Sequence, residues 1–186
     1  MSKKGDETKK MITQAATELF ALKGFKDVSM SDICEKTGLS RGGLYRHYSS
    51  TSEIFSQIIS NETSFDERIK NKESALLILN ENLNILEGEI QNSAGSLSLA
   101  IYEYANMDEN SKEFAKLLSG AKKRWADLIE YGIKTKEFNK VDPDATAEML
   151  LYYYQGIRMW SRVMDIGKKP AQNYRKIIVD YLTKGK

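Results

Sequence analysis

An all-α fold is predicted by the spacing of apolar residues and by the composition of this 186-residue chain. Apolar residues recur at steps of three and four rather than two, which is the period of a helix with one buried face. Only two prolines interrupt the chain and 41% of its residues are hydrophobic, so long helices can form and share a core. The length exceeds one minimal domain, and we expect a small N-terminal unit followed by a larger helical body.

The first helix is predicted from about Glu7 to Leu22. Its apolar stripe is expected to contain Met11, Ile12, Ala15, Leu19 and Leu22. Gly24 ends this helix, because glycine readily takes the left-handed backbone of a helix C-terminus.

Residues 28–54 predict two short helices joined by a tight turn. Ser29 or Ser31 caps the first short helix, and Ile33 and Cys34 supply its buried face. The turn is Thr37-Gly38-Leu39, in which Gly38 is free to take a positive φ. Such a pair of helices is typical of a helix-turn-helix, which docks in the DNA major groove.

The second short helix carries hydrogen-bond donors on its outer face. Ser40 caps it, and Leu44 and Tyr48 face the core. The outer surface is expected to contain Arg41, Gly42, Tyr45, Arg46 and His47. Two adjacent glycines cost about 1 kcal/mol each inside a helix. Packing a small core does not require both Gly42 and Gly43, so we expect the backbone to approach a ligand there.

Four further helices are expected before the last two. Ser50 and Glu53 have the spacing of a capping box, so a helix begins after Ser50 and continues through Ile54 and Ile58 toward Ile69. The next helix has a seam at three- and four-residue steps, formed by Leu76, Leu79, Leu83, Leu86 and Ile90. Residues 93–96 break it. Helices over residues 97–107 and 111–136 follow.

The last two helices are predicted to form a homodimer. Asp142 caps the first of them and Pro143 is its first residue, and it runs to about Ile166. One of its sides contains Met149, Tyr153, Gly156, Trp160 and Val163, and apolar residues also occupy its other sides. Gly167 and Pro170 separate it from the last helix, whose stripe is Tyr174, Ile177, Ile178, Tyr181 and Leu182. Two such surfaces suit a four-helix dimer interface, and the alternative is that one chain alone fills both faces.

Aromatic residues are frequent beyond residue 97, and several converging between helices would line a site for a small molecule. The residues expected to bind an effector are Tyr102, Trp125, Tyr153 and Trp160. The effector would be apolar, aromatic or cationic, and Glu103, Arg158 and Arg162 either set its polarity or are simply solvated. The alternative interpretation is that these aromatic residues are ordinary core or dimer contacts.

Charge and cysteine content narrow the classes of function. Residues 1–60 carry a net charge of +2 and the remainder is neutral, so nucleic-acid binding must depend on a small basic surface. That surface consists of Lys3, Lys4, Lys9, Lys10, Lys26, Lys36, Arg41 and Arg46. One cysteine excludes an intrachain disulfide, and the absence of a long apolar run predicts a cytoplasmic protein without a membrane span. We expect no cofactor, no metal and no catalysis, because His47 is the only histidine and no ligand cluster is present.

Residues Thr8 to Ile59 resemble the N-terminal DNA-binding domain of the TetR family of bacterial transcriptional regulators. The matching residues are Ile12, Ala15, Leu19, Phe20, Gly24, Phe25, Ile33, Gly38, Leu39, Ser40, Gly43, Leu44, Tyr45 and His47. The resemblance implies that Ser40 to His47 is the recognition helix, that Tyr45 and His47 contact phosphates, and that Arg41 and the two glycines lie near base edges. This chain departs from the family pattern at Thr51, where the resemblance implies a phosphate-binding lysine. The salt dependence of DNA binding should therefore be shallower.

The sequence therefore predicts a helix-turn-helix DNA-binding domain over residues 1–50 and a helical effector-binding and dimerisation domain over residues 51–186. The residues expected to bind DNA are Ser29, Ser31, Ser40, Arg41, Gly42, Gly43, Tyr45, Arg46, His47 and Thr51. We expect a transcriptional regulator, most simply a repressor that a small molecule releases from a palindromic operator in double-stranded DNA. An activator, or a small-molecule binding protein with the same fold, is the alternative.

Overall fold

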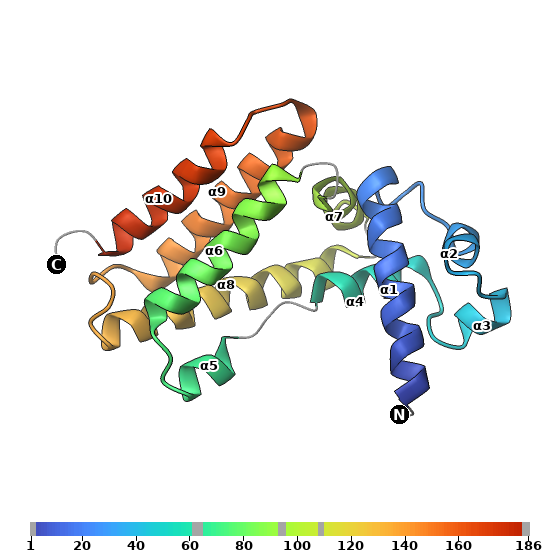
Figure 1. Ribbon diagram of the computed structural model, residues 1–186, viewed down its shortest axis with the longest axis horizontal. Helices are drawn as coiled ribbons and strands as arrows, with labels where there is room; N and C mark the ends of the chain where they lie inside the picture. Colours follow the sequence, from blue (N-terminus) through green and yellow to red (C-terminus); the bar gives the residue numbers. More distant parts are fainter. Residues whose placement is uncertain (1–2, 61–64, 93–95, 108–109, 184–186) are drawn as a thin grey trace. The chain divides into compact units, whose positions relative to one another are not determined.

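A computed structural model describes residues 3–60, 65–92, 96–107 and 110–183, and the side chains of Lys3 and Lys4 lie outside this description. Every regular element within the described residues is an α-helix, so the predicted all-α class is confirmed (Figure 1). The bounds are α1 Lys3–Lys23, α2 Met30–Thr37, α3 Arg41–Tyr45, α4 Thr51–Ser60, α5 Asp66–Lys70, α6 Ala75–Gln91, α7 Ser98–Ala105, α8 Ser111–Lys134, α9 Pro143–Val163 and α10 Lys169–Thr183.

The chain divides into two compact units. Unit 1 comprises Met1–Glu62 and Leu97–Phe114, and unit 2 comprises Thr63–Ser96 and Ala115–Lys186. Packing thus places α4 and α7 together with α1, α2 and α3. The domain boundary predicted between residues 50 and 51 divides the chain by function rather than by packing, and it stays a prediction.

Helix α1 begins four residues earlier than predicted, and its buried stripe matches the prediction only in part. Ile12, Ala16 and Phe20 are fully buried at steps of four residues, whereas Met11 and Leu22 expose 40% and 70% of their surface. The prediction that Met11 and Leu22 face the core is wrong, because both residues lie together on one flank of the helix, outside the buried row. Gly24 ends the helix with φ +85°, as predicted.

The short helices of unit 1 differ from the prediction at their C-terminal ends. Helix α3 ends at Tyr45, and a turn follows in which the amides of His47 and Tyr48 both donate to the carbonyl of Leu44. The predicted recognition helix through His47 is therefore too long. Helix α4 ends at Ser60, and residues 61–64 lie outside the described part of the chain.

Helices α5, α6, α8, α9 and α10 build the core of unit 2. Ile69 belongs to the separate helix α5, which corrects the expected continuation of α4. The predicted seam of α6 is confirmed, since Leu79, Leu83 and Ile90 are buried and Leu76 and Leu86 pack beside them. The predicted break after α6 lies largely outside the described residues, because it includes residues 93–95.

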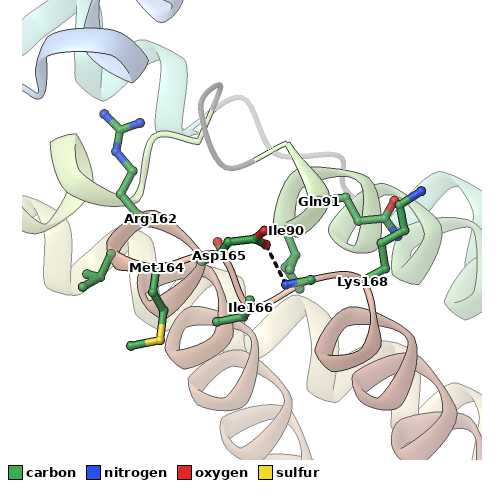
Figure 2. Close-up of a pocket in the computed structure, with 10 residues that line it drawn as sticks. Ile90, Gln91, Arg162, Met164, Asp165, Ile166 and Lys168 are labelled. Carbon is green, nitrogen blue, oxygen red and sulfur yellow. Dashed lines mark hydrogen bonds between the residues drawn. The ribbon is translucent and has the colours of Figure 1, made fainter.

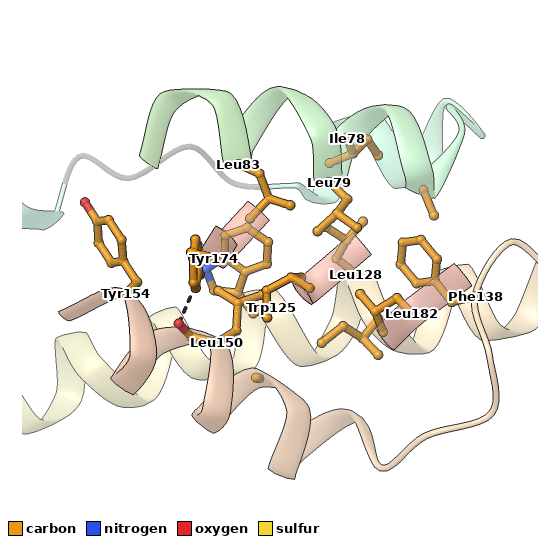
Figure 3. Packing of buried hydrophobic residues seen from close by; sticks show 14 of the residues in the cluster. Ile78, Leu79, Leu83, Trp125, Leu128, Phe138, Leu150, Tyr154, Tyr174 and Leu182 are labelled. Atoms are coloured by element: carbon orange, nitrogen blue, oxygen red, sulfur yellow. Dashed lines mark hydrogen bonds between the residues drawn. The ribbon is translucent and has the colours of Figure 1, made fainter. Parts of the chain in front are cut away.

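Helix α9 begins where the sequence predicted. Asp142 is its N-cap and accepts a hydrogen bond from the amide of Ala145 at 3.0 Å, and Pro143 is its first residue. Tyr174 of α10 packs against α9 and its hydroxyl donates to the carbonyl of Leu150 at 3.0 Å (Figure 3). Burial raises the pKa of Tyr174, so this hydroxyl stays protonated and remains a donor.

Candidate nucleic-acid interface

Ser29 fixes the start of α2 through a reciprocal capping box. Its hydroxyl accepts from the amide of Asp32 at 3.2 Å, and its own amide donates to the Asp32 carboxylate at 2.9 Å. Lys23 at the end of α1 donates to the same carboxylate at 2.7 Å. These bonds from Lys23 and Ser29 hold the pKa of Asp32 well below its usual range. The choice between Ser29 and Ser31 as the cap is thereby settled in favour of Ser29.

The turn between α2 and α3 follows the predicted chemistry. Gly38 has φ +71°, and Ser40 caps α3 by accepting from the amide of Gly43 at 3.2 Å. Leu44 and Tyr48 are buried, as expected. The backbone of this five-residue helix is thus held by a cap at one end and by two core residues at the other.

The outer surface of α3 carries exposed donors. Arg41, Gly42, Tyr45 and Arg46 are exposed, and His47 is half-buried. Arg41 donates from Nη2 to the hydroxyl of Ser31 on α2 at 3.1 Å. This bond holds the exposed guanidinium, so the contribution of Ser31 within the structure is to orient Arg41.

The two glycines of α3 have different surroundings. A Cβ added to Gly42 would meet no protein atom within 4 Å, whereas one added to Gly43 would lie 3.3 Å from the Ser40 hydroxyl. The space beside Gly43 is occupied by the helix cap, so the surroundings within the chain account for one of the two glycines. Nothing within the described residues requires a glycine at position 42.

Helix α4 begins at Thr51 with an arrangement that is only half of the predicted capping box. The hydroxyl of Ser50 accepts from the amide of Glu53 at 3.1 Å, as expected. The carboxylate of Glu53 instead accepts from the amide and hydroxyl of Ser49, at 2.6 and 2.7 Å. These bonds lower the pKa of Glu53, so a negative charge lies in the first turn beside the half-buried Thr51.

The four aromatic residues predicted to bind an effector have different environments. Tyr102 belongs to unit 1 and exposes 60% of its surface. In unit 2, Trp125 is 8% exposed with its ring 5.1 Å from that of Phe65, so it is a core residue. Tyr153 and Trp160 expose 37% and 57% of their surface on α9. The structure therefore separates Trp125 from the exposed pair.

Glu103 and Arg158, which the sequence suggested either line an effector site or are solvated, both bind other groups of the protein. The carboxylate of Glu103 accepts from two backbone amides of unit 1. Arg158 is 7% exposed, donates from Nε to the hydroxyl of Ser96 at 2.9 Å, and lies 5.6 Å from the ring centre of Tyr154. Glu89 lies 3.8 Å from the guanidinium and accepts from the Tyr154 hydroxyl. Periodicity did not predict this buried polar cluster, because an arginine on a helix usually faces water.

A pocket of about 570 Å³ lies where α6 and α9 end (Figure 2). Its apolar walls include Ile90, Met164 and Ile166, and its charged residues are Arg162, Asp165 and Lys168. The volume is within the range of small-molecule sites. None of the four predicted effector residues lines this pocket.

An apolar face extends along α9 and α10. Its members expose between 37% and 66% of their surface: Met149, Tyr152, Tyr153, Trp160, Val163, Met164, Ile177 and Tyr181. Tyr174, Ile178 and Leu182 are fully buried within the chain, so their inclusion in a surface stripe is wrong. An added Cβ at Gly156 would meet nothing within 4 Å, so α9 has an open position along this face.

Membrane and metal sites find no support in the part of the chain that the structure describes. No helix there is both long and apolar enough to cross a membrane. The same residues contain no group of three His, Cys, Asp or Glu side chains placed to hold a metal ion.

The helix-turn-helix with exposed donors defines a DNA-binding class of protein, and comparison with known sequences identifies the family. Residues 12–58 match the family model described as "Bacterial regulatory proteins, tetR family". The chain is 31% identical over 163 residues to the uncharacterized HTH-type transcriptional regulator YfiR of Bacillus subtilis (strain 168), which covers 82% of this chain and 78% of YfiR. The chain belongs to the tetR family of bacterial regulatory proteins, and it is a DNA-binding transcriptional regulator rather than an enzyme.

Solved structures share the whole fold. A TetR-family regulator from Agrobacterium tumefaciens superposes with a TM-score of 0.72 at 16% identity, covering 96% of this chain and 99% of its own. Full-length TylP, a TetR regulator from Streptomyces fradiae, gives a TM-score of 0.74 at 17% identity and covers 97% of this chain and 81% of its own. At these identities the likeness establishes the fold alone.

Proposed function

We propose that this chain is a homodimeric repressor that binds a partly palindromic operator and is released by a small molecule. The observation that carries the proposal is the outer surface of α3, where Arg41, Gly42 and Tyr45 are exposed while Ser40 and Leu44 fix the backbone. A helix held in this way can enter the major groove with its donors already oriented.

Each DNA-facing residue has a proposed role. Arg41, held by Ser31, reads the edge of a guanine through O6 and N7. Gly42 allows the backbone to approach the groove. Tyr45, Arg46, His47 and Thr51 contact phosphates, which position the protein without specifying sequence. Ser29, Ser40 and Gly43 act through the two helix caps rather than by contact.

Selection of DNA fragments by the purified protein tests this function. We expect enrichment of a partly palindromic sequence, and Arg41→Ala should lower affinity for it by about 1–3 kcal/mol and relax one base position in each half-site. Lys36→Ala is the matched control, because it also removes one positive charge from the same motif, and Lys36 forms an ion pair with Glu18 on α1. It should weaken binding to all sequences alike. An unchanged base preference of Arg41→Ala would remove Arg41 from the reading role.

A second copy of this chain is the proposed occupant of the α9–α10 face. The eight apolar side chains of this face are exposed on two adjacent helices, and such a patch is typical of a protein–protein interface. Burial of this face against the same face of another chain gives a closed two-fold dimer. Such a dimer carries two copies of α3, which is what a palindromic operator requires.

The proposed effector shifts an equilibrium between DNA-binding and released states through its different affinity for each. Trp125 and Trp160 are the only tryptophans, so fluorescence of Trp125→Phe and Trp160→Phe variants reports on one ring at a time. A compound from an apolar and cationic panel should change the fluorescence and release DNA. If only anionic compounds do so, and Lys168→Ala abolishes the effect, the effector binds in the pocket of Figure 2 instead.

The sign of regulation and the location in the cell belong to the same proposal. We propose a cytoplasmic repressor, and transcription from a promoter that contains the selected operator should fall when the protein is added. A rise would identify an activator. Failure to select any DNA sequence would favour the alternative of a small-molecule binding protein.

A further inference from the structure

Helix α7 holds the turn that leads into the helix-turn-helix. Glu103 of α7 accepts hydrogen bonds through Oε2 from the amide of Phe25 at 2.6 Å and from the amide of Lys26 at 3.0 Å. Both amides lie between α1 and α2, about 77 residues away in sequence. A carboxylate that accepts two amide hydrogens makes charge-assisted bonds, which are shorter and stronger than bonds between neutral groups.

Gly24 lets the backbone come this close to the carboxylate. A Cβ at position 24 would lie 2.6 Å from Oε2 and 3.1 Å from Cδ of Glu103. The positive φ of Gly24 therefore ends α1, and its missing side chain leaves room for Glu103.

Tyr104, the next residue of α7, connects the same helix to α4. Its buried ring lies 5.1 Å from the rings of Phe25 and Phe55. Its hydroxyl donates to Glu113 at 3.0 Å, and the other carboxylate oxygen of Glu113 accepts from Ser56 on α4. Helix α7 thus contacts the α1–α2 turn and α4, the two segments that flank α2 and α3.

We propose that Glu103 is a positioning residue for DNA recognition, which fixes the α1–α2 turn and with it the orientation of α2 and α3. Only Asp27 and Val28 separate the held amide of Lys26 from Ser29, the N-cap of α2. The inference rests on the proposed DNA-binding surface, but Glu103 itself acts without touching DNA. It assigns a function in DNA recognition to a segment that the sequence places in the second half of the chain.

Binding of DNA to charge-changing variants tests the proposal, because electrostatics and positioning predict opposite signs. Glu103→Ala removes a negative charge, and electrostatics alone would strengthen binding to every duplex. Loss of positioning should instead weaken binding to the selected operator at least about tenfold, which is about 1.4 kcal/mol, and leave an unrelated duplex bound as well or better. Glu103→Gln should recover most of the loss, since the amide oxygen still accepts from both backbone amides.

Glu130→Ala is the matched control, because Glu130 lies on the surface of α8 in an ion pair with Lys134. It removes the same charge and should not lower the ratio of operator to unrelated binding. Circular dichroism must give the same folded fraction for all variants at the assay temperature. Equal losses on both duplexes, or an operator affinity of Glu103→Ala that matches that of Glu130→Ala, would overturn the proposal.

Amide hydrogen exchange gives a readout that does not depend on DNA. Glu103→Ala should accelerate exchange in Met30–Thr37 and Arg41–Tyr45 relative to α6, whereas a general loss of stability would accelerate all helices together. If the wild-type protein selects no operator, the proposed function fails. Exchange in α2 and α3 then decides the present inference, and unchanged rates there would overturn it.

Discussion

Gly42 and Gly43 are neighbours in α3, yet only one of them is explained within the protein. Gly43 leaves room for the Ser40 cap, whereas the space around Gly42 is open. An interior glycine destabilises a helix by about 0.5–1 kcal/mol relative to alanine. A position that accepts this cost without a contact in the chain is a strong candidate for close approach of an external ligand.

Gly42→Ala should separate stability from binding. The added methyl group meets no protein atom, so we expect the free energy of unfolding to rise by about 0.5–1 kcal/mol. Affinity for the selected operator should fall, because the methyl group would intrude between α3 and the DNA. Urea unfolding and gel-shift titration measure the two effects. Gly43→Ala is the control and should lose stability, since its methyl group crowds the cap. Unchanged operator affinity of Gly42→Ala would place the groove elsewhere.

Thr51 lies at a position where the resemblance to the family implies a phosphate-binding lysine. We expect Thr51→Lys to strengthen DNA binding and to steepen the logarithmic dependence of affinity on salt by about one unit, because it adds one phosphate contact. Thr183→Lys on α10 adds the same charge in unit 2 and should leave the slope unchanged. A flat response of Thr51→Lys would mean that the start of α4 lies away from the phosphates, or that Glu53 neutralises the new charge.

At the scale of helices, the sequence predicts starts better than ends. Ser29, Ser40 and Asp142 each cap a helix by accepting a hydrogen bond from the amide three residues later in the sequence. Such short-range pairs can be recognised from the sequence alone. The end of α3 at Tyr45 has no glycine or proline to mark it. The separation of α5 from α4 was missed although Ser, Asn and Thr cluster at residues 60–64, a composition typical of loops.

Contacts between distant residues explain what the sequence could not predict about the site. The sequence left Glu103 and Arg158 open between lining an effector site and being solvated, because helical spacing says nothing about partners 62 to 78 residues away. The exposed donors of α3 were predictable, since the Ser40 cap and the buried Leu44 and Tyr48 set the rotation of that short helix. The bond from Arg41 to Ser31 was not, because side-chain rotamers follow from packing between elements.

Glu137 stabilises the start of α6 and makes that helix sensitive to acid. Its carboxylate accepts from the amides of Ala75 and Leu76 at 3.0 and 3.1 Å, and also from the hydroxyls of Ser74 and Thr135. Burial alone would raise the pKa of Glu137, but these hydrogen bonds outweigh it and lower the pKa to about 2 from the ordinary 4.5. A lowered pKa in the folded state means that the contribution is complete above pH 4.5 and is lost as the pH falls toward 2.

Glu137→Gln should therefore cost stability at pH 7 but progressively less in acid. At pH 7 we expect a loss of about 0.5–2 kcal/mol, the usual range for a helix cap. Urea unfolding of both proteins between pH 7 and pH 3 measures the difference. The gap should narrow below pH 4.5, because protonation of Glu137 makes the wild-type side chain neutral as well. A gap that stays constant with pH would contradict the charged cap.

At the scale of the whole molecule, the net positive charge of the N-terminal segment and the exposed apolar surface lie in different parts of the chain. The first 60 residues carry the entire net charge of +2, and the remaining chain is neutral. The apolar face lies on α9 and α10 in unit 2. This division suits a protein whose contact with DNA is electrostatic and whose contact with a second copy depends on the hydrophobic effect.

Gly156→Arg tests the dimer without disturbing the fold of one chain. Ile178 is unsuitable for this purpose, because it is fully buried and a charge there would unfold the protein whether or not it dimerises. At Gly156 the added side chain extends into open space, and replacement of a helical glycine by arginine favours the helix by up to about 1 kcal/mol. In a dimer through α9 and α10, however, the arginine would be buried against the partner without a counter-charge.

We therefore expect Gly156→Arg to sediment as a folded monomer and to lose high-affinity binding to the full operator, because each monomer contacts only one half-site. Gly88→Arg on α6 is the matched control. Its position is equally open, but it lies outside the α9–α10 face, so the variant should remain dimeric. Sedimentation velocity, with circular dichroism to verify folding, distinguishes the outcomes. A Gly156→Arg protein that stays dimeric, or a wild-type protein that is monomeric throughout, would assign the exposed aromatic residues of α9 to another partner.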